Sequence, residues 1–279
     1  MTTAMRTSKL FFGLFSLLSL FGLSLGTFLR PSVSWGTLAG LFRKDTTPSR
    51  EVYVTDSLLL QRDRKGVPSH LLERKSYLVS YNKTTLQPNW VSWYLTREHA
   101  DGDVPRQQDF IEDMEVLPRP MLTDYRGSGY DRGHMCPAGD NKWDQQAMYE
   151  SFYLTNMCPQ DADLNSGLWN KFEQDCRRWA KRYGSLYIVC GPLFGEGYKT
   201  IGRNRVAVPD AFFKVVLCLE GRPKGLGIVC PNTPGQKRKD LRYLSIDEVE
   251  SITGMDFFPS LPDDVEEDVE SHADPKAWK

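Results

Sequence analysis

The sequence of 279 residues predicts an α+β fold, in one large domain or two small ones. Several short apolar or alternating runs are typical of strands, and two further segments carry the periodicity and end signals of helices. Hydrophobic residues make up 40% of the chain and charged residues 25%, which is enough apolar material for a packed core. This composition excludes a collagen, a coiled coil, a mostly disordered chain and a polytopic membrane protein.

The predicted strands cover residues 77–81, 90–95, 186–190, 212–219 and 226–230. Two helices are predicted, each followed by a glycine. In the first, five apolar residues recur at spacings of 4, 4, 3 and 4. They are Leu168, Phe172, Cys176, Trp179 and Tyr183, and Gly184 follows as a stop signal. The second spans residues 245–253, where Ser245 and Glu248 form a capping-box pattern and Gly254 follows.

The N-terminal segment has the character of a signal peptide or a signal anchor. Residues 10–29 carry no charge and follow Arg6 and Lys9. We therefore expect residues 1–30 to engage a membrane or the export machinery, and residues 31–50 to be a linker before a domain over residues 51–260. The expected location is periplasmic or secreted, with residues 10–29 either cleaved off or retained as an anchor.

The formal net charge of −1 hides an uneven distribution. Residues 256–279 contain eight acidic and two basic residues, whereas residues 31–255 contain 30 basic and 28 acidic residues. The acidic end predicts a disordered tail over residues 261–279. The weakly basic body does not exclude a nucleic-acid-binding protein, but it indicates modest affinity.

His134 is the strongest catalytic candidate among the four histidines. It ends the run Asp131-Arg132-Gly133-His134, which places a titratable base beside an arginine on an approachable, glycine-flanked backbone. An imidazole with an ordinary pKa near about 6.5 is suited to general-base catalysis near neutral pH. The alternative is a loop with a local Asp–Arg ion pair and an incidental histidine.

The six cysteines contain no C-x-x-C pair, which argues against a zinc ribbon or a thioredoxin-type site. They are Cys136, Cys158, Cys176, Cys190, Cys218 and Cys230. We expect disulfides, as in an oxidising compartment, with buried free thiols as the alternative. An unpaired cysteine could link two copies into a homodimer.

Cys136 could also be read as a nucleophile beside His134, but Pro137 follows it and no helix N-terminus is evident there.

Asn165 and Glu173 are placed to hold a hydrated cation. They lie eight residues apart at the start of the first helix, so Asn165, Trp169 and Glu173 fall within about 80° of one side. An amide oxygen and a carboxylate in this arrangement can hold one hard cation, directly or through water. The alternative is an asparagine that caps the helix and a surface glutamate.

Taken together, these residues resemble the DNA/RNA non-specific endonuclease family, the endonuclease G-like nucleases, over roughly residues 77–265. The motifs are Asp131-Arg132-Gly133-His134, Asn156-Met157-Cys158-Pro159-Gln160, Leu164-Asn165 with Trp169 and Glu173, Cys190-Gly191-Pro192-Leu193, Val208-Pro209-Asp210-Ala211-Phe212-Phe213-Lys214 and Leu261-Pro262-Asp263-Asp264-Val265. The resemblance implies a ββα-metal (His-Me finger) core inside a mixed domain built on a central antiparallel sheet. His134 would lie on a β-hairpin packed against the helix that begins near Asn165.

The resemblance also implies the chemistry. His134 would be the general base, Asn165 the direct ligand of Mg²⁺, for which Mn²⁺ could substitute, and Glu173 would orient a water of the ion. Arg132 would bind phosphate, as would Arg106, which is matched only by its offset across a variable loop.

Three further residues are named through the resemblance. Arg97 is the alternative to Arg106. Asn156 would help to hold the substrate or the site. Asp131 would orient the arginine or the hairpin rather than perform chemistry.

We therefore expect an exported Mg²⁺-dependent endonuclease that cleaves DNA and RNA and leaves 5′-phosphate ends. One alternative is a nucleic-acid-binding module that keeps the fold without turnover, and another is a phosphodiesterase for small substrates. The presence of His134, Asn165, Glu173 and Arg132 argues against the module, since binding alone needs no base.

Overall fold

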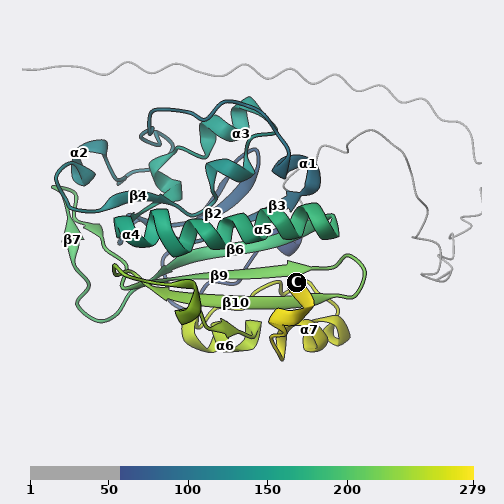
Figure 1. The fold of residues 1–279 in the computed structure, drawn as a ribbon. Coiled ribbons are helices and arrows are strands. Elements are labelled where there is room, and N and C mark those ends of the chain that lie inside the picture. The colour runs from purple at the N-terminus through teal and green to yellow at the C-terminus, as the bar shows by residue number, and fades with distance from the viewer. Residues whose placement is uncertain (1–56) are drawn as a thin grey trace, which may run out of the picture. The chain divides into compact units, whose positions relative to one another are not determined.

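A sheet of seven antiparallel strands organises the part of the chain that the computed structural model describes, residues 57–279 (Figure 1). The strand order is β1-β2-β3-β6-β9-β10-β11. These strands are β1 (His70–Glu73), β2 (Tyr77–Asn82), β3 (Gln87–Thr96), β6 (Ser185–Leu193), β9 (Ala211–Cys218), β10 (Lys224–Pro231) and β11 (Tyr243–Leu244). Each of the five predicted strands forms part of this sheet, and the predicted central antiparallel sheet is confirmed. The predicted signal segment (1–30) and linker (31–50) lie outside the described residues.

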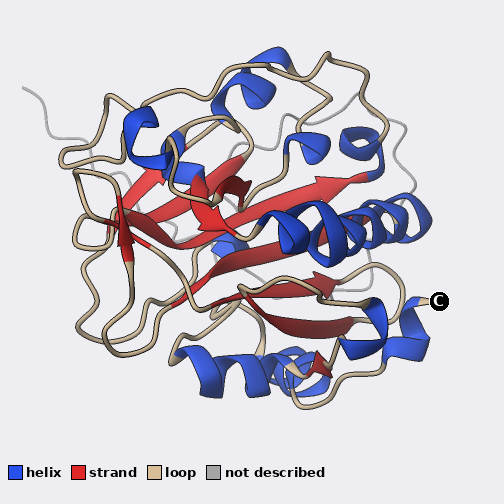
Figure 2. Ribbon diagram, turned by 60° about the vertical axis from the view of Figure 1, so that its left-hand side comes forward, coloured by secondary structure: helices blue, strands red, loops and turns tan. Residues whose placement is uncertain are grey.

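Alternate residues of the sheet pack on opposite faces and form two hydrophobic cores. In β2, Tyr77 and Val79 belong to the first core and Leu78 to the second. The first core lies under α5 (Asn170–Tyr183), and the second lies under α6 (Ile246–Thr253) and α7 (Asp263–Glu270). Figure 2 shows the sheet between these two layers of helices.

Both predicted helices are present. In α5, Phe172, Cys176 and Trp179 are buried along one face, and Gly184 ends the helix with φ of 113°, a conformation that favours glycine. In α6, the predicted capping box of Ser245 and Glu248 is formed in both directions. Local periodicity and end signals were therefore sufficient to place these two elements.

Shorter elements complete the described part of the chain. They are the helices α1 (Arg97–Ala100), α2 (Leu122–Tyr125), α3 (Gln145–Glu150) and α4 (Ala162–Leu164), and the strand pairs β4 (Asp131–His134) with β5 (Met157–Gln160) and β7 (Thr200–Ile201) with β8 (Val206–Ala207). Among residues 57–279, none of the helices has the length and apolar character needed to cross a membrane.

The acidic end of the chain is folded, so the prediction of a disordered tail is wrong. Helix α7 places Val265 and Val269 four residues apart on one face, and Val269 is buried in the second core. Beyond α7, Trp278 is buried against Trp179 with ring centroids 4.7 Å apart. The domain therefore continues to the last residue rather than ending at residue 260.

The predicted disulfides are not formed. All six cysteines are free and buried. The structure therefore has the alternative, thiols packed in the core as small apolar groups. Because no thiol is exposed, a disulfide that links two copies has no support in this fold.

Candidate active site

The site is built on a ββα unit formed by β4, β5 and α5. Strands β4 and β5 pair antiparallel with His134 opposite Met157, and the helical segment that leads into α5 follows β5 directly. Gly133 lies beneath the side chain of Gln160, which a Cβ atom at this position would overlap. A larger residue would displace that side chain just before His134. The ββα core that the resemblance implied is confirmed.

His134 is enclosed between aromatic rings at the end of β4. Its side chain packs edge-on against Phe152 at a centroid distance of 4.9 Å and against Phe110 at 5.7 Å. Burial, together with the nearby charge of Arg106, lowers the pKa of His134 to about 3. The Nε2 atom makes no hydrogen bond to any described residue. The imidazole is therefore neutral near pH 7 and free to accept a proton, in contrast to the ordinary pKa expected from sequence.

Asn156 holds the backbone that follows His134. Its Oδ1 accepts a hydrogen bond of 2.9 Å from the Cys136 N–H, and its Nδ2 donates to the carbonyls of Cys136 and Ser151 at 2.9 and 2.8 Å. Its own carbonyl accepts from the Met135 N–H. Asn156 is fully buried. Asn156 was predicted to hold either the substrate or the site. Its side chain bonds to the backbone behind the site and does not line the cavity.

Asn165 is oriented by Asp131 across the gap between helix and strand. The Asn165 Nδ2 donates a hydrogen bond of 2.9 Å to Asp131 Oδ2, which leaves the amide oxygen as the atom available to a cation. The sequence predicted that Asp131 orients the arginine or the hairpin, but its carboxylate instead accepts the hydrogen bond of the Asn165 amide. Only the structure brings these residues together, because 34 positions separate them in the chain.

The helix does not begin with a regular turn at Asn165. Residues Asn165–Trp169 form a π-helical turn in which Gly167 has the non-helical angles φ −95° and ψ −107°. Trp169 consequently lies in the first core, with its ring 5.6 Å from that of Phe212. The predicted alignment of Asn165, Trp169 and Glu173 on one side of a regular helix is wrong for Trp169.

Glu173 lies in the first turn of α5, above a buried lysine. Lys214 Nζ is 3.9 Å from Glu173 Oε1 and 4.5 Å from the centre of the Trp169 ring. Burial raises the pKa of Glu173, and the positive charge of Lys214 opposes this shift. Sequence reasoning missed Lys214 as part of the site. Its signal was a single charge inside the apolar run 212–219.

One cavity of about 480 Å³ brings the predicted residues together. Its lining includes His134, Asn165, Glu173, Arg132 and Arg106. Asn156 is absent from that lining, in keeping with its position behind the site.

The two predicted phosphate ligands are held by aromatic rings. The guanidinium of Arg132 lies 4.4 Å from the centre of the Phe110 ring, and that of Arg106 lies 5.0 Å from the centre of the Phe152 ring. Arg97 instead donates from Nε to the Lys181 carbonyl at 2.9 Å and does not line the cavity. Of the two arginines predicted as alternatives for this phosphate ligand, Arg106 lines the cavity and Arg97 does not.

Arg177 is a cavity residue that the sequence did not single out. Its Nη1 is 2.7 Å from Asp140 Oδ1, and the other oxygen of Asp140 accepts a hydrogen bond of 3.0 Å from the Trp93 indole. Asp140 is almost fully buried and so anchors Arg177 at the edge of the cavity. In the sequence, Arg177 is one of several basic residues along α5, so nothing distinguished it.

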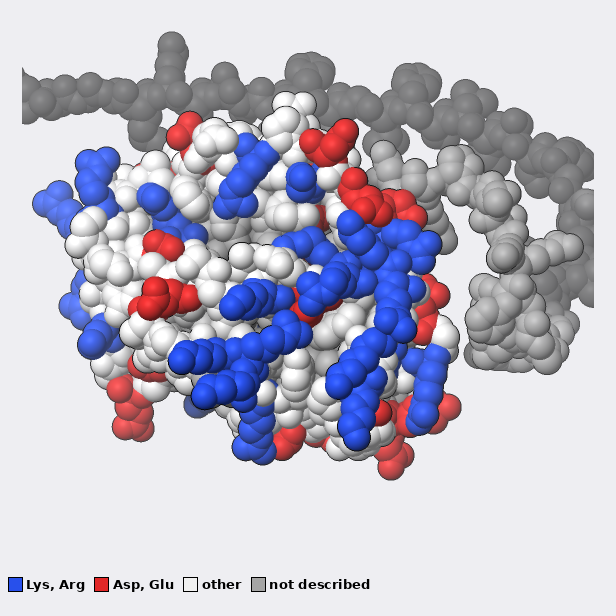
Figure 3. Space-filling model, in the orientation of Figure 1, with Lys and Arg blue, Asp and Glu red and all other residues white. Residues whose placement is uncertain are grey.

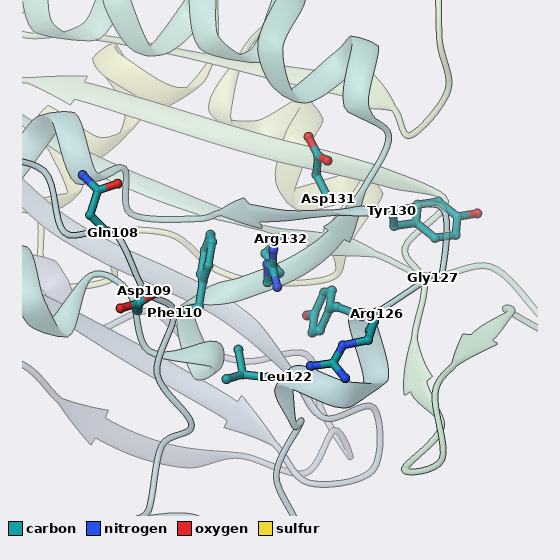
Figure 4. Close-up of a pocket in the computed structure, with 10 residues that line it drawn as sticks. Gln108, Asp109, Phe110, Leu122, Arg126, Gly127, Tyr130, Asp131 and Arg132 are labelled. Atoms are coloured by element: carbon teal, nitrogen blue, oxygen red, sulfur yellow. The ribbon is translucent and has the colours of Figure 1, made fainter.

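A second hollow, of about 610 Å³, adjoins the first. The two share Phe110, Asp131 and Arg132 in their linings. Figure 4 shows Phe110 beside Arg132, whereas Asp131 projects from the opposite side of the same strand. Arg126 and Tyr130 also line this second hollow. The site thus continues into a groove lined by two arginines, two aspartates and aromatic rings.

Cys136 cannot serve as a nucleophile in this arrangement. Its side chain is fully buried, and its Sγ accepts a hydrogen bond of 3.3 Å from Asn141 Nδ2. Burial raises the pKa of the Cys136 thiol well above its usual value, so a thiolate is disfavoured. The reading as a cysteine hydrolase is therefore wrong.

Basic side chains gather on the face of the molecule that carries α5. Figure 3 shows lysine and arginine side chains spread over this helix and the strands below it. Those exposed on α5 are Lys171, Arg178, Lys181 and Arg182. A chain with a net charge of −1 therefore presents a basic surface next to the cavity.

Comparison with known proteins gives consistent matches. The family model of the DNA/RNA non-specific endonuclease matches residues 59–264. Human mitochondrial nuclease EXOG is 34% identical over 263 residues, which are 86% of this chain and 69% of that protein. Nuclease C1 from Cunninghamella echinulata var. echinulata is 36% identical over 222 residues, with 73% of this chain and 88% of that protein covered. A crystal structure of the EndoG/EndoGI complex has a TM-score of 0.65 at 33% identity and covers 71% of this chain and 89% of that chain.

The predicted periplasmic or secreted location is contradicted by these relatives. EXOG is named as a mitochondrial nuclease, and so are human endonuclease G, at 37% identity, and a relative from Saccharomyces cerevisiae, at 36% identity. The expectation of export is therefore wrong. The nuclease character is confirmed by the same relatives. Since the family model spans most of the chain and the ββα unit carries the site, this protein belongs to the DNA/RNA non-specific endonuclease family and is a nuclease.

Proposed function

We propose that the protein is a Mg²⁺-dependent endonuclease that cleaves DNA and RNA with little preference for sequence or sugar. His134 is the general base and Asn165 the ligand of the ion. The observation that carries this proposal is the single cavity lined by His134, Asn165, Glu173, Arg106 and Arg132. A base, two oxygen donors and two guanidinium groups in one cavity are the groups that hydrolysis of a phosphodiester requires.

The donor atoms of the site fit a hydrated Mg²⁺ ion. The hydrogen bond to Asp131 engages the Asn165 amide nitrogen and leaves the amide oxygen free for a cation, and Glu173 offers a partly exposed carboxylate in the same cavity. Mg²⁺ commonly takes one or two protein oxygens and keeps its remaining waters. When bound there, the ion would stabilise the negative charge that develops on the phosphate and the leaving oxygen.

Side chains of the protein accept the proton, bind the phosphate and position the base. The neutral His134, which lines the cavity, accepts the proton of the attacking water. Arg106 and Arg132 bind phosphate oxygens, and their aromatic neighbours restrict the directions in which the guanidinium groups point. Asn156 fixes the backbone after His134 and so keeps the imidazole at its place in the cavity.

The adjoining groove supports a polymeric substrate over a small phosphodiester. It extends the cavity past Arg132 toward Arg126 and Tyr130, so nucleotides beyond the scissile phosphate have positive charge and aromatic surface to contact. Contacts of this kind are made to phosphates and base faces rather than to base edges. They predict broad sequence tolerance and an affinity that falls as salt concentration rises.

Cleavage of a supercoiled plasmid and of a single-stranded RNA by the full chain tests the proposal. We expect nicking of both substrates with Mg²⁺, loss of activity in EDTA, and a loss of about 10²- to 10⁴-fold for His134→Ala. His70→Ala is the matched control, because His70 is exposed on β1 outside the cavity. Full activity in EDTA would overturn the metal assignment, and binding of both nucleic acids without cleavage would favour a binding module. Cleavage confined to a small phosphodiester such as bis-p-nitrophenyl phosphate would favour the small-substrate enzyme.

A further inference from the structure

Three carboxylates meet on the face of the sheet opposite α5. Asp247 and Glu250 come from α6 and Glu270 from α7, which lie next to each other against β10 (Figure 1). One side-chain oxygen from each of the three residues lies within 4.8 Å of the others. None of them belongs to the cavity that holds His134.

Glu270 shows that this is more than a cluster of surface acids. Its side chain is 3% exposed, and its Oε1 has no hydrogen-bond partner among the described residues. None of the ion pairs formed within residues 57–279 includes Asp247, Glu250 or Glu270. A buried carboxylate oxygen without a partner is costly, so this arrangement calls for a positive group that the described side chains do not supply.

The charged groups that shift the pKa of Glu270 are all carboxylates. Glu250 and Asp247 face Glu270 from α6, Glu266 from its own helix, and Asp256 from the segment after α6. Burial first, and then these carboxylates, raise the pKa of Glu270 to about 8. Arg62 is held by the carboxylate of Asp256 at 2.7 Å.

We propose that Asp247, Glu250 and Glu270 form a divalent-cation site, best suited to Ca²⁺, that ties α7 to α6. Carboxylate oxygens are the ligands that hard cations prefer, and Ca²⁺ binds them at about 2.4 Å. Two oxygens on opposite sides of such an ion are about 4.8 Å apart, so three donors that lie within 4.8 Å of one another can share one ion. Asp247 is exposed, so water completes the coordination from that side.

The site gives a physical reason for the folding of the acidic end. Helix α7 has an acidic residue at six of its eight positions and no basic residue, yet it must pack Val269 into the second core. A cation shared with α6 offsets the repulsion between the two helices at the point where Glu270 is buried. Ion binding and docking of α7 are then thermodynamically linked.

Thermal unfolding of the full chain, stripped of metal and titrated with CaCl₂, tests the site. Every variant carries Asn165→Ala, which removes the proposed ligand of the active site and confines the response to α6 and α7. We expect the Tm to rise by about 5 °C or more when free Ca²⁺ reaches about 100 times the Kd. Glu270→Gln should lose this rise. Isothermal titration should show one Ca²⁺ site in the parent protein that keeps Glu270.

Glu267→Gln is the matched control, because Glu267 is exposed on α7 and should keep the full response. Without Ca²⁺, Glu270→Gln should unfold at or above the Tm of its parent, since it relieves repulsion, and this shows that the variant folds. An equal Ca²⁺ response in Glu270→Gln would overturn the proposal. So would the absence of any shift or binding heat up to about 10 mM Ca²⁺, a concentration above the range of weak calcium modules.

Discussion

At the scale of single residues, the enclosure of His134 determines its protonation. The rings of Phe110 and Phe152 cover part of the imidazole and bury it, and Arg106 adds a positive charge nearby. Both influences disfavour the protonated ring. The base is thus available without first losing a proton to solvent.

This enclosure predicts the pH dependence of the reaction. A histidine base with an ordinary pKa gives a kcat/KM that rises through about pH 6.5, because kcat/KM follows the free enzyme. With the pKa of His134 lowered to about 3, the imidazole stays neutral across about pH 5 to 8, and kcat/KM at saturating Mg²⁺ should lack that rise. Circular dichroism at each pH controls for unfolding. A rise centred near pH 6.5 would show that the imidazole is not held neutral.

A second prediction at this scale concerns Asp131, whose carboxylate accepts the hydrogen bond that orients the Asn165 amide. Asp131→Ala should raise the Mg²⁺ concentration for half-maximal cleavage by about 10- to 100-fold, the usual effect of losing a group that orients a metal ligand. Asp163→Ala, an exposed change on α4, is the control. An unchanged Mg²⁺ requirement in Asp131→Ala would mean that Asn165 is oriented by other contacts.

At the scale of elements, the sequence placed α5 and α6 because their signals are local. The periodicity that ends at Gly184 and the capping box at Ser245 need no tertiary information. The π-helical turn at Asn165 was not foreseeable, because Gly167 departs from the helical angles where packing places Trp169 in the core. A regular helix was therefore the wrong template for that turn.

The site residues that could be predicted from the sequence are likewise those with local signals. His134 and Asn165 belong to short motifs, whereas Arg177 is held at the cavity by Asp140 and Lys214 lies beside Glu173, contacts that only the tertiary structure creates. The choice between Arg106 and Arg97 likewise depends on the course of a loop. For α7, charge density suggested disorder, although Val265 and Val269 already had helical spacing.

At the scale of the whole molecule, charge is separated between the two faces of the sheet. The basic side chains of α5 lie on the layer that carries the active site, and the acidic helix α7 lies on the other. A polyanion is therefore attracted toward the cavity and repelled from the opposite face. The net charge of the chain conveys neither property, because it averages over both faces.

The proposed reaction depends on His134 as the base, and chemical rescue tests this role. Single-turnover cleavage by His134→Ala with Mg²⁺ should be slower by about 10²- to 10⁴-fold, and added imidazole should restore part of the rate by filling the space between Phe110 and Phe152. Rescue should follow the concentration of neutral imidazole. Cleavage by His134→Ala at the wild-type rate, without imidazole, would contradict the account.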